Sequence, residues 1–234
     1  MRLKEIFKDI QINKNDWLQS RTGDDFEQRM ETILKKKGFN RILKEDIPQE
    51  SFKIIKNKIQ NKIAREYVEN ILSDKKEFIE CFIFQPFGSQ NFPDFLVFTR
   101  KYILAVEIKY SRNKAIKPMW NSNLPKNKAI YIFGSYSLKD VTFFLGRDIL
   151  PIAERKELIS FFEKVKKEEI NFKLGMAKEM KLKKITCDRG FGVYIRRAYE
   201  QNKRINKKAN LNYFSHPGRL SAEKAVLNFC EKIN

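Results

Sequence analysis

Two carboxylates and an amine stand out because they interrupt an apolar part of this chain, the stretch FGSQNFPDFLVFTRKYILAVEIKYSRN at residues 87–113. Asp94 follows a proline, and Glu107 and Lys109 are separated by a single residue, Ile108. Side chains alternate between the two faces of a β-strand, so Glu107 and Lys109 share one face while Ile108 points into the core. The spacing therefore predicts a polar site on one face of an otherwise buried strand.

A tight hairpin is expected to bring the first carboxylate to this site. The apolar runs Phe92–Thr99 and Tyr102–Tyr110 are typical of strands, and only Arg100 and Lys101 separate them. Counting outward from that turn places position 94 beside position 107.

Neighbouring carboxylates of this kind indicate cation chemistry. Asp94 and Glu107 would repel each other unless they shared a cation. Mg²⁺ commonly uses one or two protein carboxylates, together with water and phosphate oxygens. Lys109, on the same face, can orient a water molecule or stabilise charge that develops on phosphate. These residues favour a Mg²⁺ site that hydrolyses a phosphate ester.

A purely structural role is the alternative for these three residues. Asp94 can cap a turn, and Glu107 with Lys109 can form an exposed cross-strand pair, as many strands do. The combination of a Pro-Asp step, a hairpin-length spacing and an otherwise apolar run favours the site.

The charge of the whole chain points to a polyanionic partner. Its 234 residues include 48 Lys and Arg against 29 Asp and Glu, a net charge of +19. Such a field attracts nucleic acid, although the bias of an AT-rich genome also raises the lysine content. No apolar run is long enough to cross a membrane, no signal peptide is visible, and three separated cysteines suit a reducing compartment. We expect a cytoplasmic protein of one domain, residues 1–234, with no membrane partner.

Two absences from the sequence, of further histidines and of a nucleotide-binding loop, exclude several kinds of catalytic site. His216 is its only histidine, which excludes a His-dyad nuclease and a Cys/His zinc site. No GxxxxGK[ST] loop is present, so no nucleotide cofactor is expected.

Helices are predicted on both sides of the central strands. The segment Thr22–Phe39 begins with a capping-box pattern and carries one apolar face. Basic residues fill its last turn, and a glycine, Gly38, ends the helix. Further helical patterns cover Phe52–Leu72 and Ile152–Val165. The remaining strand candidates are Phe78–Phe84, Ala129–Phe133 and Val141–Leu145. This order predicts an α/β (α+β) fold with a central mixed sheet of about five strands flanked by helices.

Pro93-Asp94 followed by Glu107-Ile108-Lys109 resembles the signature of the PD-(D/E)XK nuclease superfamily position for position. The resemblance covers about residues 22–145, the expected catalytic core, and implies a restriction-endonuclease-like fold. It also implies that Asp94, Glu107 and the Ile108 carbonyl hold Mg²⁺, that Lys109 positions the attacking water, and that cleavage leaves 5′-phosphate ends.

The helix before the signature often bears an acidic residue near the metal in this family. Glu27 stands at the corresponding place and is expected to be a catalytic residue of the outer shell or of a second metal. Asp24, Asp25 and Glu31 compete for the same role.

Within the superfamily the chain is similar to type II restriction endonucleases in its length, its compact motif, its GSQNFPDF entry and its basic C-terminal segment, residues 178–234. This implies Mg²⁺-dependent cleavage of double-stranded DNA at a specific short sequence by a homodimer that matches a two-fold symmetric site. The alternatives are a structure-directed repair or junction nuclease of the same fold, a non-catalytic DNA-binding protein and, with less support, an RNA-processing nuclease.

Candidate DNA contacts follow from charge and side-chain chemistry, since Arg and Asn read bases whereas Lys generally contacts phosphate. Around the predicted site they are Gln90, Arg112, Asn113, Lys114, Lys117, Asn121, Asn123 and Lys126. In the basic C-terminal segment they are Arg196, Arg197, Lys203, Arg204, Lys207 and Lys208. An ordinary polar loop and a solvated charged surface are the respective alternatives, and Trp120 is expected to pack rather than stack on a base.

Overall fold

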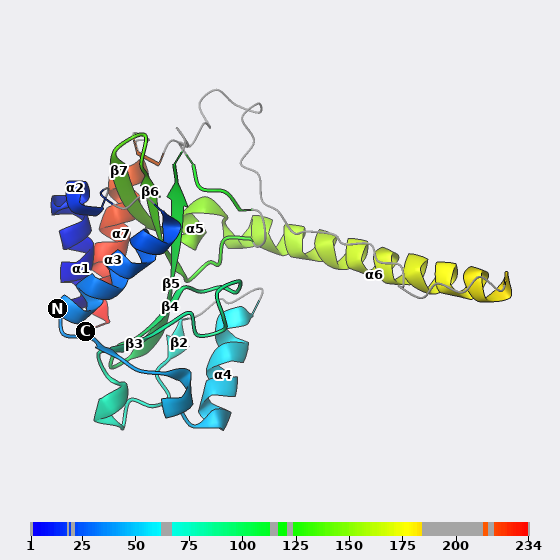
Figure 1. Ribbon diagram of the computed structural model, residues 1–234, viewed down its shortest axis with the longest axis horizontal. Helices are drawn as coiled ribbons and strands as arrows, with labels where there is room; N and C mark the ends of the chain where they lie inside the picture. The colour runs from blue at the N-terminus through cyan, green and yellow to red at the C-terminus, as the bar shows by residue number, and fades with distance from the viewer. Residues whose placement is uncertain are drawn as a thin grey trace.

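The structure is a computed structural model that describes residues 2–17, 19, 22–61, 67–112, 117–120, 124–183, 213–214 and 218–233. These residues form a mixed α/β fold in which helices cover both faces of one open sheet (Figure 1). The predicted fold class is confirmed.

The sheet is mixed, as expected, and has the strand order β1-β3-β4-β5-β6-β7, with β2 paired to β5 beside this path. Pairing is parallel for β1–β3 and β5–β6 and antiparallel for the other neighbours. The five strands that the sequence predicts correspond to β3 to β7, and two strands of two residues each, β1 and β2, extend the sheet to seven. The strands are β1 (Asn40–Arg41), β2 (Val68–Glu69), β3 (Cys81–Phe84), β4 (Phe95–Phe98), β5 (Tyr102–Ser111), β6 (Ile130–Ser135) and β7 (Asp140–Leu145).

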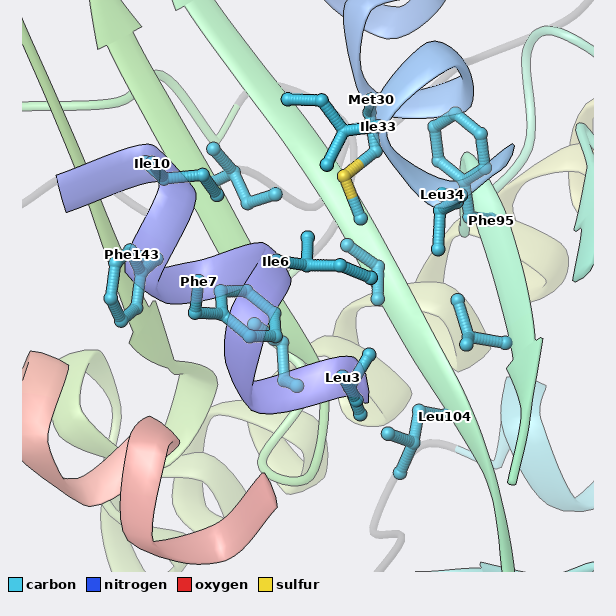
Figure 2. Packing of buried hydrophobic residues seen from close by; sticks show 14 of the residues in the cluster. Leu3, Ile6, Phe7, Ile10, Met30, Ile33, Leu34, Phe95, Leu104 and Phe143 are labelled. Atoms are coloured by element: carbon cyan, nitrogen blue, oxygen red, sulfur yellow. The ribbon is translucent and has the colours of Figure 1, made fainter. Parts of the chain in front are cut away.

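One face of the sheet is covered by helices from both ends of the chain, α1 (Arg2–Ile12), α3 (Gly23–Lys36) and α7 (Gly218–Lys232), with the short α2 (Lys14–Trp17) beside them. Figure 2 shows side chains of α1 and α3 packed against strand residues such as Phe95 and Leu104. The amphipathic pattern of these helices explains the layer, because their apolar stripes are buried while their charged faces remain outside.

The other face holds a second apolar cluster, to which α4 (Gln49–Gln60) contributes Ile55 and Ile59. The short helix α5 (Gly146–Ile149) and the 3₁₀ turns Lys44–Asp46 and Lys76–Phe78 lie along the remaining connections. Alternate residues of β5 enter the two clusters, with Val106 and Ile108 in the first and Ile103 and Ala105 in the second. Glu107 and Lys109 continue the second series, so their side chains lie on the α4 face of the sheet.

Helix α3 forms as its capping pattern predicts. The Thr22 hydroxyl accepts a hydrogen bond from the Asp25 main-chain N–H, and the Asp25 carboxylate accepts one from the Thr22 N–H. Just beyond the helix, Gly38 adopts a positive φ of 84°. The capped first turn thus sets the direction in which the acids of this helix project.

Three predicted element boundaries need correction. The pattern at Phe52–Leu72 was expected to be one helix, but α4 ends at Gln60 and Val68–Glu69 is strand β2. Pairing of Val68 with Ile103 of β5 overrides the local helical preference. Strand β3 begins at Cys81 rather than Phe78, because a 3₁₀ turn and the positive φ of Glu80, 55°, precede it.

The third correction concerns α6 (Ile152–Leu182), which continues far past the expected end at Val165. At 1.5 Å per residue its 31 residues span about 46 Å, and most of the helix projects away from the sheet (Figure 1). Its beginning packs against the rest of the fold through Ile159, which contacts Leu124 and Leu150. Among the described residues, no helix combines the length and the apolar character that crossing a membrane requires.

Candidate functional site

The hairpin of β4 and β5 creates the site as its spacing predicts. The two strands pair Phe95 with Val106 and Phe98 with Ile103, and the same register places Asp94, just before β4, opposite Glu107. The turn is closed by a 2.8 Å hydrogen bond from the Thr99 N–H to the Tyr102 carbonyl. A local turn thereby fixes the approach of two acids that lie 13 positions apart in the sequence.

The Asp94 carboxylate is held by main-chain contacts. Its Oδ2 accepts a 2.6 Å hydrogen bond from the Ile108 N–H, and the Asp94 carbonyl accepts one of 2.7 Å from the Gln85 N–H. The N–H and C=O of an extended residue point to the same side of the strand, so the Ile108 carbonyl also lies on the Asp94 side. Two kinds of oxygen, carboxylate and carbonyl, are thus placed on one side of β5.

Glu107 and Lys109 share a face and contact each other, with Lys109 Nζ 2.7 Å from Glu107 Oε1. Their side chains are only 12% and 26% exposed, so they do not form the solvated pair that the sequence left open. The second oxygen, Glu107 Oε2, is buried and has no hydrogen-bond partner among the described residues. A buried anionic oxygen without a donor is costly unless a cation or a donor reaches it.

Burial, and then the negative charge of Glu107, raise the pKa of Asp94 from 3.8 to about 8. Ionising Asp94 beside Glu107 at neutral pH therefore calls for positive charge beyond that of Lys109. A hard divalent cation would supply that charge, and Mg²⁺ in particular needs few protein oxygens. The donor set of Asp94, Glu107 and the Ile108 carbonyl fits this requirement.

A denser metal centre is not formed by the part of the chain that the structure describes. No three or more side chains of His, Cys, Asp or Glu gather there in a way that could hold an ion. Ligation by the proposed set would depend on two carboxylates and one carbonyl, with the remaining positions left to water and phosphate oxygens, as Mg²⁺ prefers.

Of the four acids that compete on α3, Glu27 is the one that lines the same pocket as Asp94 and Glu107. Burial raises its pKa more than a hydrogen bond from Gln85 lowers it, and the charges of Asp24 and Glu107 add to the rise. Asp25 is engaged in the helix cap, and Glu31 forms ion pairs with Lys35 and Arg41 at 2.7 and 2.8 Å.

The pocket has a volume of about 260 Å³ and is lined mainly by polar groups of the site and of the segment 89–91. Trp120 and Tyr131 form part of its wall, and their rings meet edge to face at 4.9 Å. Trp120 is 6% exposed, in agreement with the expectation that it packs. The cavity is large enough for a phosphate group with its water molecules.

The candidate DNA contacts around the site have different environments. Gln90 lines the pocket, Arg112 is exposed just after β5, and Lys117 is half-buried. Lys126 donates hydrogen bonds to the Gln60 and Asn61 carbonyls at 2.9 and 3.0 Å, so it also caps the end of α4. The others lie outside the described residues, namely Asn113, Lys114, Asn121, Asn123, Arg196, Arg197, Lys203, Arg204, Lys207 and Lys208.

Two residues of the site were missed by sequence reasoning. Gln85 joins the site through its side chain as well, because its Nε2 donates a 3.2 Å hydrogen bond to Glu27 Oε2. Tyr131 lies beside Glu107 in the parallel pairing of β5 and β6, and its hydroxyl accepts a 2.7 Å hydrogen bond from the Lys126 N–H. Neither has a local sequence signal, since each reaches the site only through strand pairing.

Comparisons with protein-family models, with curated proteins and with solved structures find no match for this chain. Its function must therefore be inferred from its own residues and their arrangement.

Proposed function

We propose that this chain is a Mg²⁺-dependent endonuclease of the PD-(D/E)XK type that hydrolyses phosphodiester bonds in double-stranded DNA. One observation carries the proposal above all. Asp94 is held by the Ile108 N–H opposite Glu107, whose Oε2 is buried without a donor among the described residues, while Lys109 lies on the same face. Two partly buried carboxylates beside an amine in a polar pocket are suited to cation-assisted attack on phosphate.

The residues of the chain would divide the work as follows. Asp94, Glu107 and the Ile108 carbonyl would hold Mg²⁺, which when bound supplies positive charge to neutralise the phosphate. Lys109 would hold the attacking water by a hydrogen bond and stabilise charge on the phosphate oxygens. Glu27, at the pocket wall, would orient groups beyond the direct ligands, and Gln85 would fix Glu27. In-line attack by water would leave 5′-phosphate ends.

The net charge of +19 favours DNA as the polyanion. By its resemblance to type II restriction endonucleases, we further propose cleavage at a specific short sequence by a homodimer acting in the cytoplasm. A two-fold symmetric site is matched most simply by two copies of one chain, each cutting one strand. This finer assignment depends on resemblance and charge, whereas the catalytic proposal depends on the pocket.

The first experiment is an incubation of the purified chain with a long unmethylated duplex and Mg²⁺, with EDTA and Asp94→Ala as controls. Discrete bands that disappear in both controls are expected, and sequencing of the ends would then give the recognition site. A smear that disappears in Asp94→Ala would still support a nuclease, but it would indicate nonspecific or structure-directed cleavage instead of site-specific cleavage. An intact duplex, followed by an intact branched DNA, would contradict the proposal in favour of a binding protein.

A further inference from the structure

A tryptophan lies beneath the amine of the proposed active site. Lys109 Nζ is 5.9 Å from the centroid of the Trp120 ring, within the range of a cation–π contact. The indole is held from the side by Tyr131, at 4.9 Å and an interplanar angle of 80°. Tyr131 in turn stacks on Phe144 at 5.8 Å. The ring below Lys109 is thus fixed by the aromatic core.

Lys109 therefore has two attractive neighbours. One is Glu107 Oε1, at 2.7 Å, and the other is the Trp120 ring. If Glu107 shares its charge with a divalent cation, the attraction of Glu107 for the ammonium weakens and the cation itself repels Lys109. The attraction of the ring does not depend on the protonation or ligation of Glu107.

We propose, on the basis of the nuclease function inferred above, that Trp120 is a positioning residue that holds the Lys109 ammonium in the pocket when Glu107 is engaged elsewhere. Tryptophan offers the strongest cation-binding face among the aromatic side chains. Its indole N–H is buried with no acceptor among the described residues, a cost that a leucine or a phenylalanine at this position would avoid. The identity of the side chain is explained by its ring face rather than by packing alone.

The contact can be tested without any cleavage, by NMR of Lys109 in the full chain, with its signals assigned from the Lys109→Ala variant. Protons above a ring face are shifted upfield, so the Lys109 Hε and Hζ signals should lie upfield in the wild type. Trp120→Leu should abolish the shift and Trp120→Phe should retain part of it, both without and with saturating Ca²⁺. Unchanged Lys109 signals in Trp120→Leu would overturn the proposal.

The consequence for the reaction is tested by a double-mutant cycle. Trp120→Leu should lower kcat about tenfold with little change in KM for DNA, and Trp120→Phe should lose clearly less. In a Lys109→Ala background, Trp120→Leu should cause no further loss, because its effect passes through Lys109. Loss of the same factor in both backgrounds, or equal losses in Trp120→Leu and Trp120→Phe, would contradict the positioning role.

Leu124→Val serves as the matched control, since Leu124 is 5% exposed, lines the same pocket and belongs to an apolar cluster without Lys109. Any damage from its looser packing should lower kcat by the same factor in both backgrounds.

The two tests also distinguish failure of the positioning role from failure of the nuclease function. A wild-type chain that cuts no DNA would remove the nuclease function, while the NMR shift would still decide whether Trp120 holds Lys109.

Discussion

Asp94 Oδ2 accepts a 2.6 Å hydrogen bond from the main-chain N–H of Ile108, the residue between Glu107 and Lys109. This bond ties the acid at the entry of β4 to the strand that carries the other two polar groups of the site. Because the donor belongs to the main chain, the hydrogen bond does not depend on the Ile108 side chain, and only proline would remove the donor. It uses one carboxylate oxygen and sets the direction of the other.

The substitution Asp94→Asn separates this hydrogen bond from the charge. The amide oxygen of the new side chain can still accept from Ile108, but the negative charge that would hold Mg²⁺ is gone. Loss of a group that merely orients a metal ligand costs about 10- to 100-fold, so loss of a ligand should reduce cleavage by at least about 100-fold. DNA affinity in Ca²⁺, followed by fluorescence anisotropy, should change little. Cleavage by Asp94→Asn near the wild-type rate would remove Asp94 from the site.

The raised pKa of Asp94 predicts how the stability of the metal-free chain depends on pH. Its folded pKa, about 8, lies above the unfolded value of 3.8, so the folded state binds the proton more tightly. Stability associated with this group is fully present below the unfolded pKa and is lost as pH rises toward 8. Since one pKa unit corresponds to about 1.4 kcal/mol, wild type should lose about 2 kcal/mol or more relative to Asp94→Asn between pH 5 and pH 8.

Urea unfolding in EDTA at both pH values would measure this difference. Adding Ca²⁺ or Mg²⁺ at pH 8 should restore stability to the wild type and leave Asp94→Asn unchanged, because only the wild type has the full anionic site. Parallel pH profiles for the two proteins would mean that Asp94 ionises in the folded state as easily as in the unfolded chain.

The geometry of Asp94 and Glu107 could be predicted because it depends on local chain properties. A two-residue turn fixes the register of the hairpin, and the alternation of side chains fixes the face. The capped start of α3 was predictable for the same reason, since Thr22 and Asp25 are neighbours in the sequence.

Contacts between distant segments could not be predicted from the pattern. Gln85 reaches Glu27 only because β3 and α3 are brought together by the sheet, and Tyr131 lies beside Glu107 only through the parallel pairing of β5 with β6. Val68 became a strand residue for a related reason, since its pairing with Ile103 outweighs the helical pattern around it. Parallel pairing and short added strands leave little local signal, because their partners are far away in the sequence.

The basic C-terminal segment leads to a prediction about salt. If Arg196 and Arg197 contact DNA phosphates, Arg196→Gln with Arg197→Gln should lower the slope of log K against log[salt] by about 1.8, or about 0.9 for each contact. Exposed Lys8 on α1 and Lys224 on α7, which cover the sheet face opposite Glu107 and Lys109, provide a control of equal charge. Their double replacement by Gln should leave the slope within about 0.5 of the wild type, because it removes no phosphate contact. An equal change in both variants would indicate a general field effect rather than phosphate contacts of the two arginines.

An ionic network joins the C-terminal helix to the edge strand of the sheet. Arg219 of α7 donates to Asp140 at 2.6 and 3.0 Å, to Glu223 at 3.0 Å and to the Val141 carbonyl of β7 at 3.0 Å. Burial alone would raise the pKa of Asp140, but hydrogen bonds from Arg219 and Lys14 outweigh it and lower the pKa. Glu223 is only 3% exposed, and Arg219 is the cation that forms ion pairs with both Glu223 and Asp140.

Arg219→Met should therefore destabilise the chain by about 3–5 kcal/mol, because it leaves Asp140 and Glu223 partly or fully buried without their main cation. Arg219→Lys keeps the charge but not the forked geometry, and it should lose clearly less. Since the lowered pKa of Asp140 stabilises the fold above the unfolded pKa of 3.8, the wild type should lose this advantage over Arg219→Met as the pH falls through the folded pKa of Asp140. Urea unfolding at pH 7 and pH 3 measures both effects. A loss below about 1 kcal/mol at pH 7, or a loss that stays the same at pH 3, would show that packing of α7 rather than this network holds the edge of the sheet.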